Sequence, residues 1–490
     1  VLAALLASRV LSLRSERPLR IASTGELLSL DPLVLEGTTV LILSNVFEGL
    51  VRHDRDMRIE PALAVHWATL DDTTWQFDLR PGVRFHDGTP LTAGEIKGVF
   101  DRVRSDPTAP GQQLIANIAS VQVSGPLSLK VVTRMPSPTL LSELGWFRIA
   151  RGASAADVAT KAVGTGPYRV ARWEKGKRVE LDAFEDYWGS LPSARRLEIQ
   201  PIPPGERLAA LERGAIDIAS LPAAVAGTRL TRLTRLQIIR ADSLTRMFLW
   251  MHELADAAGP NPLADRRVRQ AVALALDRSA LRADPDANRR EASFELVPRA
   301  LFGYSPQLEE PHQDLASARR LLAAAGYRDG FEAPLIHAPD PLAAKTAAAV
   351  SQMLAAVGIK TEPRPADKGQ VMAALGGALR GFLVERWTYD DADAGAFLRD
   401  CVHSRDAAEG TGQFNPGFSD PAADRMIDAS LTTMDVNARL ARYQEIMRWA
   451  SVEQPVIPLF DQMYVYGVGP NVTWHPRLDG YILGADVATP

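Results

Sequence analysis

Apolar and polar positions alternate in two regions of the first half of the chain. Trp75, Phe77 and Leu79 are separated by single polar residues, which is the pattern of a half-buried strand. The Pro-Gly pair that follows predicts a turn into a short partner strand. Two further alternating runs surround "EKGK" (174–177) and indicate a second hairpin. By contrast, "LILSNVFEGLV" (41–51) has the apolar spacing of a helix.

Helix-like and strand-like segments alternate in the second half. A helix is predicted over 263–281, and two more are expected to end at Gly326 and Gly358. Strand-like "IKTEPR" follows Gly358, and "GQVMAALGGALRGFLVERW" (369–387) repeats the step from helix to strand. This alternation is typical of a separate α/β lobe with a partly parallel sheet.

The stretch "RFHDGTPLTAGEIKGVF" (84–100) has two interpretations. A histidine beside an aspartate is compatible with a metal or hydrolytic site. However, Thr92 and Glu95 have the spacing of a capping box at the start of a helix. His86 and Asp87 would then occupy the turn before that helix, where Asp and Gly satisfy turn geometry and need no catalytic role.

Composition indicates a globular protein of two or three domains. The chain has 490 residues, of which 46% are hydrophobic and 23% are charged. The net charge of -4 offers no basic surface for nucleic acid.

One cysteine, Cys401, excludes an internal disulfide and a cysteine metal cluster. The opening "VLAALLASRVLSL" resembles the apolar part of a secretion signal but lacks a basic start, so an ordinary helix remains the alternative. No cysteine follows it, so a lipoprotein is not expected.

Motifs for catalysis are incomplete. In "HELAD" (252–256) an aspartate stands where a zinc-protease helix needs its second histidine, and "GTG" (164–166) lacks the lysine and spacing of a phosphate loop. There is no Gly-x-Ser-x-Gly elbow. The acidic "YDDADA" (389–394) is either a solvated loop or an anchor for a cationic ligand. The sequence therefore does not predict an enzyme.

Several strings together resemble the bacterial extracellular solute-binding proteins of family 5, the peptide, opine and nickel class that serves ABC importers. The resemblance covers roughly residues 18–486. It is carried by four strings in the family's order: "PALAVHWATLDDTTWQFDLRPGVRFHDGTPLTAGEIKGVFDRVR", "VGTGPYRVARWEKGKRVELDAFEDYWG", "NPLADRRVRQAVALALDR" and "QPVIPLF".

This resemblance implies an α/β fold, the two-lobed clamshell of periplasmic binding proteins, class II-like, with an extra subdomain on the first lobe. The "FHDG" turn would belong to that subdomain. The expected parts are a possible signal-peptide remnant at 1–17, lobe I at 18–45 and 161–245, the extra subdomain at 46–160, lobe II at 246–458, and a return to lobe I at 459–490.

The implied function is binding without catalysis, with no cofactor and no metal. A monomer in the periplasm would hold a dipeptide or oligopeptide in the cleft between its lobes and deliver it to a membrane permease with its ATPases. A receptor for an opine, a sugar conjugate or a metal chelate is the alternative. A ligand-presenting chemosensory protein and an exported peptide hydrolase are more distant possibilities.

Carried over position by position, the resemblance nominates ligand-binding residues in both lobes. In peptide receptors an aspartate three residues after a tryptophan takes the ligand ammonium, and "WTYD" supplies Trp387, Thr388 and Asp390. Trp387 would form an apolar wall. The ligand-facing loop of the first lobe corresponds to "LDPLVLEGTT", with Glu36 facing a cation or water. The complete loop set is Glu36, Gly37 and Thr38.

Three further residues would matter more if the ligand were an opine, a sugar conjugate or a metal chelate. His252 stands near a position where many relatives have asparagine, and Trp250 precedes it by two residues. Arg386, beside Trp387, has the charge to hold a carboxylate.

Overall fold

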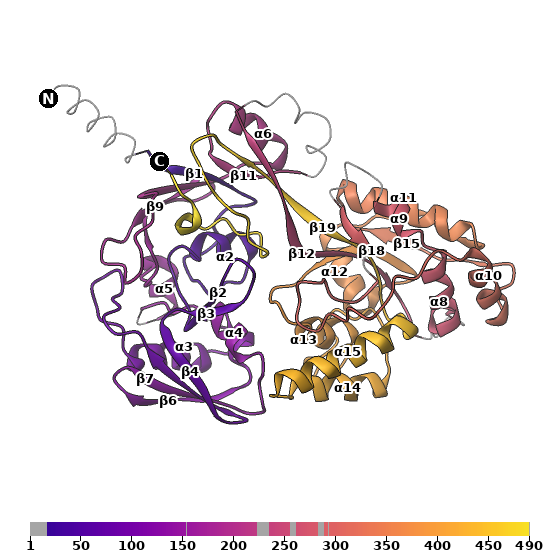
Figure 1. Cartoon of the computed structure of the whole chain (residues 1–490), viewed down its shortest axis with the longest axis horizontal. Coiled ribbons are helices and arrows are strands. Elements are labelled where there is room, and N and C mark those ends of the chain that lie inside the picture. Colours follow the sequence, from indigo (N-terminus) through magenta and orange to yellow (C-terminus); the bar gives the residue numbers. More distant parts are fainter. Residues whose placement is uncertain are drawn as a thin grey trace. The chain divides into compact units, whose positions relative to one another are not determined.

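The computed structural model describes residues 17–152, 154–222, 235–254, 261–282, 289–292 and 294–489. The chain forms two compact units, the first comprising residues up to Ala241 together with Tyr464–Pro490, and the second Asp242–Met463 (Figure 1). The segment 246–458, expected to form lobe II, lies within the second unit. Most of the possible signal remnant lies outside the described residues.

The first unit is built on a mixed sheet. Strand β1 (Leu19–Ser23) lies between β10 (Arg196–Pro201) and β11 (Ile218–Ser220), parallel to both. Beyond β10 come β9 (Arg178–Ala183) and β8 (Tyr168–Glu174), which form the antiparallel hairpin predicted around "EKGK". Alternate side chains of β9 and Tyr168 of β8 are buried in the core of this unit.

A separate antiparallel sheet lies within the same unit. Its order is β4 (Ala64–Asp71), β5 (Thr74–Leu79), β7 (Ser128–Thr133) and β6 (Ile118–Gly125). Helix α3 (Ala93–Ser105) packs against β6. Trp75, Phe77 and Leu79 are buried, as their alternation predicted.

The predicted partner strand after β5 was wrong. Both edges of β5 are already paired, with β4 on one side and β7 on the other. The chain after Pro81-Gly82 therefore forms only an isolated bridge between Arg84 and Pro90.

The turn interpretation of "FHDG" is confirmed. Asp87 Oδ1 accepts a hydrogen bond from Thr89 N at 3.0 Å, and Gly88 adopts φ +83°. His86 Nε2 lies 3.0 Å from the carbonyl oxygen of Gly166. Thr92 caps α3 by accepting from Glu95 N at 3.2 Å.

The expected helix over 41–51 is shifted toward the N-terminus. Helix α2 runs over Gly37–Leu43 because Glu36 caps its first turn. The remaining short elements of this unit are β2 (Val51–His53), β3 (Ile59–Pro61), α4 (Leu140–Trp146), α5 (Ala155–Lys161) and α6 (Pro204–Glu212).

The second unit has the partly parallel sheet that the alternation predicted. Strand β12 (Gln237–Met251) lies between β19 (Ile457–Val468) and β18 (Phe382–Thr388), and is antiparallel to β18. Beyond β18, β15 (Leu335–His337) and β17 (Pro363–Pro365) continue the sheet in parallel. The boundaries between the two units fall within β12 and within β19, so these strands connect the units along the chain.

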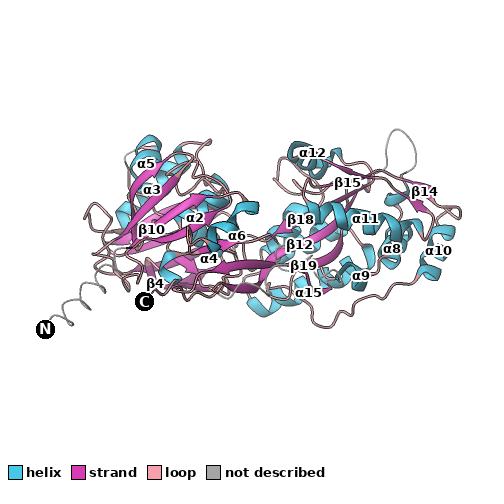
Figure 2. Cartoon of the chain, turned by 90° about the horizontal axis from the view of Figure 1, so that it is seen from above, coloured by secondary structure: helices cyan, strands magenta, loops and turns pink. Residues whose placement is uncertain are grey.

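Helices surround the second sheet (Figure 2). The helix predicted over 263–281 is interrupted, because Leu276 leaves the helical conformation between α8 and α9. The helices are α8 (Arg266–Ala275), α9 (Arg278–Arg282), α10 (Leu315–Ala324), α11 (Pro341–Ala355), α12 (Lys368–Ala373), α13 (Gly395–Phe397), α14 (Pro421–Leu431) and α15 (Val436–Glu453), and the minor strands are β13 (Arg289–Ala292), β14 (Phe331–Glu332) and β16 (Ile359–Lys360). Among the described residues we find no helix with the length and apolar character needed to cross a bilayer.

A buried carboxylate joins three sequence motifs of the first unit. Glu48 accepts hydrogen bonds of 2.9 Å from Thr165 Oγ1, Tyr187 Oη and Trp188 Nε1. Burial raises the pKa of Glu48, and the three donors oppose that rise. The motifs "FEGL", "GTGPY" and "DYWG" are thus linked through one side chain.

We predict that Glu48→Ala destabilises the protein by about 3 kcal/mol or more, because three buried donors lose their acceptor. Chemical denaturation followed by tryptophan fluorescence measures the change. Glu185→Ala is the matched control, since the side chain of Glu185 is 74% exposed. An equal effect of both substitutions would contradict a special role for Glu48.

Candidate ligand-binding site

Strand β18 carries Trp387 and Thr388 to its C-terminal end. Thr388 pairs with Thr245 of β12, and their hydroxyl oxygens are 2.9 Å apart. The half-buried ring of Trp387 contacts Phe397 and Phe414, with ring centroids 5.8 and 5.2 Å away. Trp387 therefore sits at the edge of an aromatic cluster, with part of its ring at the surface.

The chain after β18 is held in place by buried side chains on both sides of Asp390. Tyr389 is buried and donates its hydroxyl to the carbonyl oxygen of Leu296. Asp393 accepts from Arg439 Nη1 at 2.8 Å and from Tyr443 Oη at 2.7 Å. Asp393 is thus a buried anchor rather than part of a solvated loop.

Asp390 is the acidic residue of this segment that lies at the surface. Its carboxylate forms no hydrogen bond or ion pair with any residue that the structure describes. The protein atoms packed around it raise its pKa, and the negative charge of Asp400 raises it further. A cation placed beside Asp390 would reverse both effects, so the carboxylate is suited to a cationic partner.

Arg386 projects on the other side of β18 from Trp387, since neighbouring residues of a strand face opposite ways. Its Nη1 lies 3.7 Å from Oδ2 of Asp340, the residue that caps α11. The guanidinium therefore already lies near a carboxylate of its own unit.

Trp250 belongs to the buried side of this aromatic cluster, with its ring centroid 6.4 Å from that of Trp387, whereas His252 lies elsewhere; ligand contact by either residue stays a prediction. Trp250 is fully buried and donates Nε1–H to the carbonyl oxygen of Glu385. His252 follows the far end of β12, where its main-chain N–H bonds to Gly381. The antiparallel register places Gly381 and Trp387 at opposite ends of β18, about 20 Å apart at the usual rise per residue.

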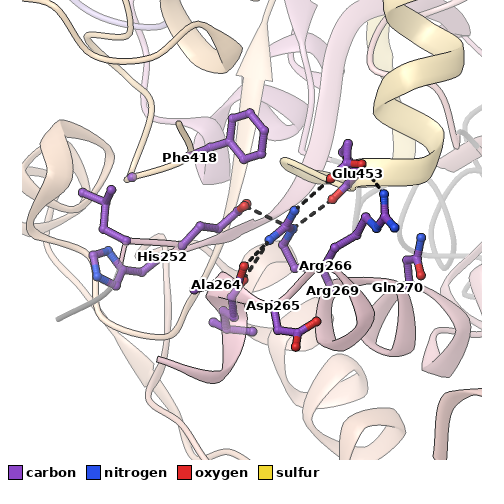
Figure 3. Close-up of polar contacts among 12 residues, drawn as sticks. His252, Ala264, Asp265, Arg266, Arg269, Gln270, Phe418 and Glu453 are labelled. Atoms are coloured by element: carbon purple, nitrogen blue, oxygen red, sulfur yellow. Dashed lines mark hydrogen bonds and ion pairs between the residues drawn. The ribbon is translucent and has the colours of Figure 1, made fainter. Parts of the chain in front are cut away.

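His252 is also buried, and Figure 3 shows it in the same region as the polar contacts of Arg269. Its Nδ1 lies 3.2 Å from the carbonyl oxygen of Pro416. The next residue, Glu253, is buried and lies 3.1 Å from Arg269 Nε, and burial raises its pKa well above the ordinary value. Arg269 also donates to the main-chain oxygen of Glu453, so this end of the sheet is a buried polar network.

In the first unit, the carboxylate of Glu36 is used within its own loop. Its oxygens accept from the main-chain N–H groups of Thr38 and Thr39 at 3.1 and 2.9 Å. The hydroxyl of Thr38 lies 3.1 Å from that of Thr24, whereas Gly37 is exposed. Ligand contact by Glu36, Gly37 and Thr38 stays a prediction, and the exposed main chain at Gly37 is its best candidate.

The first unit also contains a cavity of about 560 Å³ that sequence reasoning missed. The buried Arg148 and His53 line it. The signal in the sequence was a single arginine within the otherwise apolar run "GWFRIA". The cavity is lined by Ser44, Asn45, Phe47, Glu48, Gly49, Arg52, His53, Asp54, Arg55, Asp56, Glu60, Gly145, Trp146, Arg148, Pro167, Tyr187, His475, Arg477, Asp479, Tyr481, Leu483, Ala485 and Asp486.

We predict that Asp390→Asn leaves the protein at least as stable as the wild type at about pH 7. The pKa of Asp390 is higher in the folded protein than the ordinary value of 3.8, so folding disfavours its charged form. The wild type therefore loses stability as the pH rises from about 3.8 through the folded-state pKa. The variant does not titrate, so its advantage should appear above that range and vanish in acid. Thermal unfolding at about pH 7 and pH 3 measures both.

Asp393→Asn is the matched control for this prediction and should lower stability, because Asp393 is paired with Arg439. A loss of stability in Asp390→Asn at neutral pH would show that its carboxylate has a stabilising partner.

Comparison with known proteins agrees with this architecture. The model for "Bacterial extracellular solute-binding proteins, family 5 Middle" matches residues 58–409. The glutathione-binding protein GsiB of Salmonella typhi is 27% identical over 464 residues, covering 91% of this chain and 89% of that protein.

Two solved structures illustrate the fold. The DppA protein of Helicobacter pylori in complex with the peptide STSA has a TM-score of 0.78 at 22% identity, covering 96% of this chain and 98% of its own. The NikA protein of Brucella suis in complex with Fe(III)-EDTA has a TM-score of 0.84 at 21% identity, covering 97% and 100%. These likenesses confirm the two-lobed fold of periplasmic binding proteins. The chain belongs to family 5 of the bacterial extracellular solute-binding proteins, the periplasmic binding components of ABC importers.

Proposed function

We propose that the imported solute is a peptide or peptide-like compound with a free amino group, and that Asp390 binds that group. The proposal depends on the exposure of Asp390 and on its lack of a partner in the described part of its own unit. Its carboxylate lies at the surface without a partner among the described residues, while Tyr389 and Asp393 hold the chain on either side.

The chemistry of a ligand ammonium fits this position. An ammonium group that leaves water needs a negatively charged acceptor, and a charge-assisted hydrogen bond contributes roughly 1.5–3 kcal/mol. The ring of Trp387 offers an apolar surface three residues before Asp390 for the part of the ligand next to the amine. Because buried neighbours fix this segment, little conformational entropy would be lost on binding.

The relatives support a peptide-like solute. The relative from Salmonella typhi is named as binding glutathione, a tripeptide with a free amino group. The alternative of an opine, a sugar conjugate or a metal chelate relied on Trp250, His252 and Arg386. It is less well supported, because the first two are buried and the third lies beside Asp340.

We predict that Asp390→Asn weakens binding of glutathione or trialanine about tenfold or more, because the ammonium loses its charged acceptor. Isothermal titration calorimetry measures the affinity. The N-acetylated forms of the same peptides should bind the wild type weakly and should not distinguish it from the variant. Asp329→Asn, an exposed aspartate of the same unit, is the control and should bind like the wild type.

An affinity for the free amine within threefold of the wild type would show that Asp390 is not the anchor. Failure of the wild type to bind any peptide would contradict the peptide proposal itself. Mass spectrometry of solute that co-purifies with the protein would then identify the cargo directly.

We also propose that the protein does not transform its solute. Incubation with glutathione and with a mixture of short peptides should leave every compound intact by mass spectrometry. The reason is that binding and release are sufficient for delivery to a permease. Cleavage that one point substitution abolishes would contradict this proposal.

A further inference from the structure

The cavity of the first unit contains a buried cation, Arg148, that lacks an ion-pair partner among the residues the structure describes. Arg148 is only 7% exposed and follows α4 in the chain. It donates to Ser44 Oγ at 2.7 Å and, at the longer distance of 3.5 Å, to the main-chain oxygen of Trp146. It forms no ion pair with any described residue. Burial lowers its pKa to about 10, so it remains charged at neutral pH.

Two other buried arginines of this unit have the acceptors that usually compensate a buried guanidinium. Arg477, on the same cavity, lies 2.7 Å from Asp479 and 3.4 Å from Asp486. Arg207 donates to the main-chain oxygens of Ile202, Ser220 and Ser23 at 2.8–3.0 Å. Arg148 has neither arrangement. Asp479 and Tyr481 attract the Arg148 charge from a distance, but no carboxylate of the described residues forms an ion pair with it. A buried charge without a direct partner is unfavourable, so its presence on a cavity wall favours binding of an external anion.

Several carboxylates of the cavity are already bonded to other groups and form no ion pair with Arg148. Glu48 accepts from three donors, and Glu60 lies 3.2 Å from Arg52. Asp54 accepts from main-chain N–H groups of its own turn. These negative charges also disfavour a multiply charged anion such as phosphate, which leaves a single carboxylate as the better match.

Trp146 and His53 lie next to Arg148 on the cavity wall. The centroid of the Trp146 ring lies 5.3 Å from the Arg148 guanidinium carbon, and the buried Nε1–H of Trp146 finds no acceptor among the described residues. His53 stacks on the same ring and lies 3.1 Å from Ser142 Oγ. Burial, together with the charges of Arg148 and Arg477, lowers the pKa of His53 to about 4, so it is neutral at pH 7. Arg148 is therefore a buried cation of this cavity with donors available to an anion.

We propose that this cavity binds a carboxylate group of the solute through Arg148. The planar guanidinium can donate two parallel hydrogen bonds to one carboxylate, and Ser44 holds it from the other side. The inference rests on the proposed function in one respect, because a peptide-like solute is what would bring the carboxylate.

The test compares Arg148→Met with the wild type in two measurements. In calorimetry, the wild type should bind trialanine at least about thirtyfold more tightly than trialanine amide, and the variant should lose this preference. In thermal unfolding without solute, Arg148→Met should be as stable as the wild type or more so, because an unpaired buried charge is removed. Arg207→Met is the matched control and should lower the unfolding temperature, since three carbonyl groups lose their donors.

Three results would overturn the proposal: an unchanged preference for the free acid in Arg148→Met, equal binding of acid and amide by the wild type, or destabilisation like that of Arg207→Met. The last result would mean that Arg148 is structural. Loss of amine selectivity in Asp390→Asn with retained acid selectivity would separate the two proposed contacts.

A second measurement keeps the test independent of peptides. Titration of the wild type with acetate, followed by NMR of the His53 ring, should show a saturable shift and a raised pKa of His53, because an anion would offset the charge of Arg148. Arg148→Met should show neither change, and Asp390→Asn should respond like the wild type. An absent response in the wild type, or an equal response in Arg148→Met, would contradict carboxylate binding even if no peptide binds.

Discussion

The first unit depends on the burial of the Glu48 carboxylate. A carboxylate leaves water at a high free-energy cost unless donors replace the water, and Thr165, Tyr187 and Trp188 do so from two distant segments. Gly164 packs beside this site, where an added Cβ would come within 2.2 Å of the main-chain oxygen of Val46. The "GTG" motif therefore serves close backbone packing. Glu48 and Tyr187 also line the cavity, so the same bonds shape the proposed carboxylate site.

The two proposed contacts share one physical feature, which is a charge that its own unit leaves uncompensated. Within the described part of the chain, Asp390 has no cationic partner and Arg148 forms no ion pair with a carboxylate. In both places buried neighbours fix the position of the charge, while paired groups close by, Asp393 and Arg477, show how the chain neutralises charges that it uses for stability. At each place, the unfavourable free energy of the unpaired charge would favour binding of a solute group of opposite charge.

Much of the fold was predictable because it follows from local rules. Alternation of Trp75, Phe77 and Leu79 identified β5, and Thr92 marked the start of α3, since both signals lie within a few consecutive residues. The partner of β5 was mispredicted because strand pairing depends on segments far apart in the sequence, here β4 and β7.

For the candidate site, the sequence by itself determined which groups with the right chemistry exist and how some of them are spaced, such as Trp387 and Asp390 at the end of one strand. Only the tertiary structure decided which of these groups are available. Trp250 and Trp387 lie on neighbouring strands, yet the first is enclosed and the second reaches the surface. Arg148 and Arg477 are both buried arginines, but only Arg477 has carboxylates beside it. Burial and charge compensation depend on atoms that folding brings within a few ångströms from distant parts of the chain, and the order of residues alone does not specify those distances.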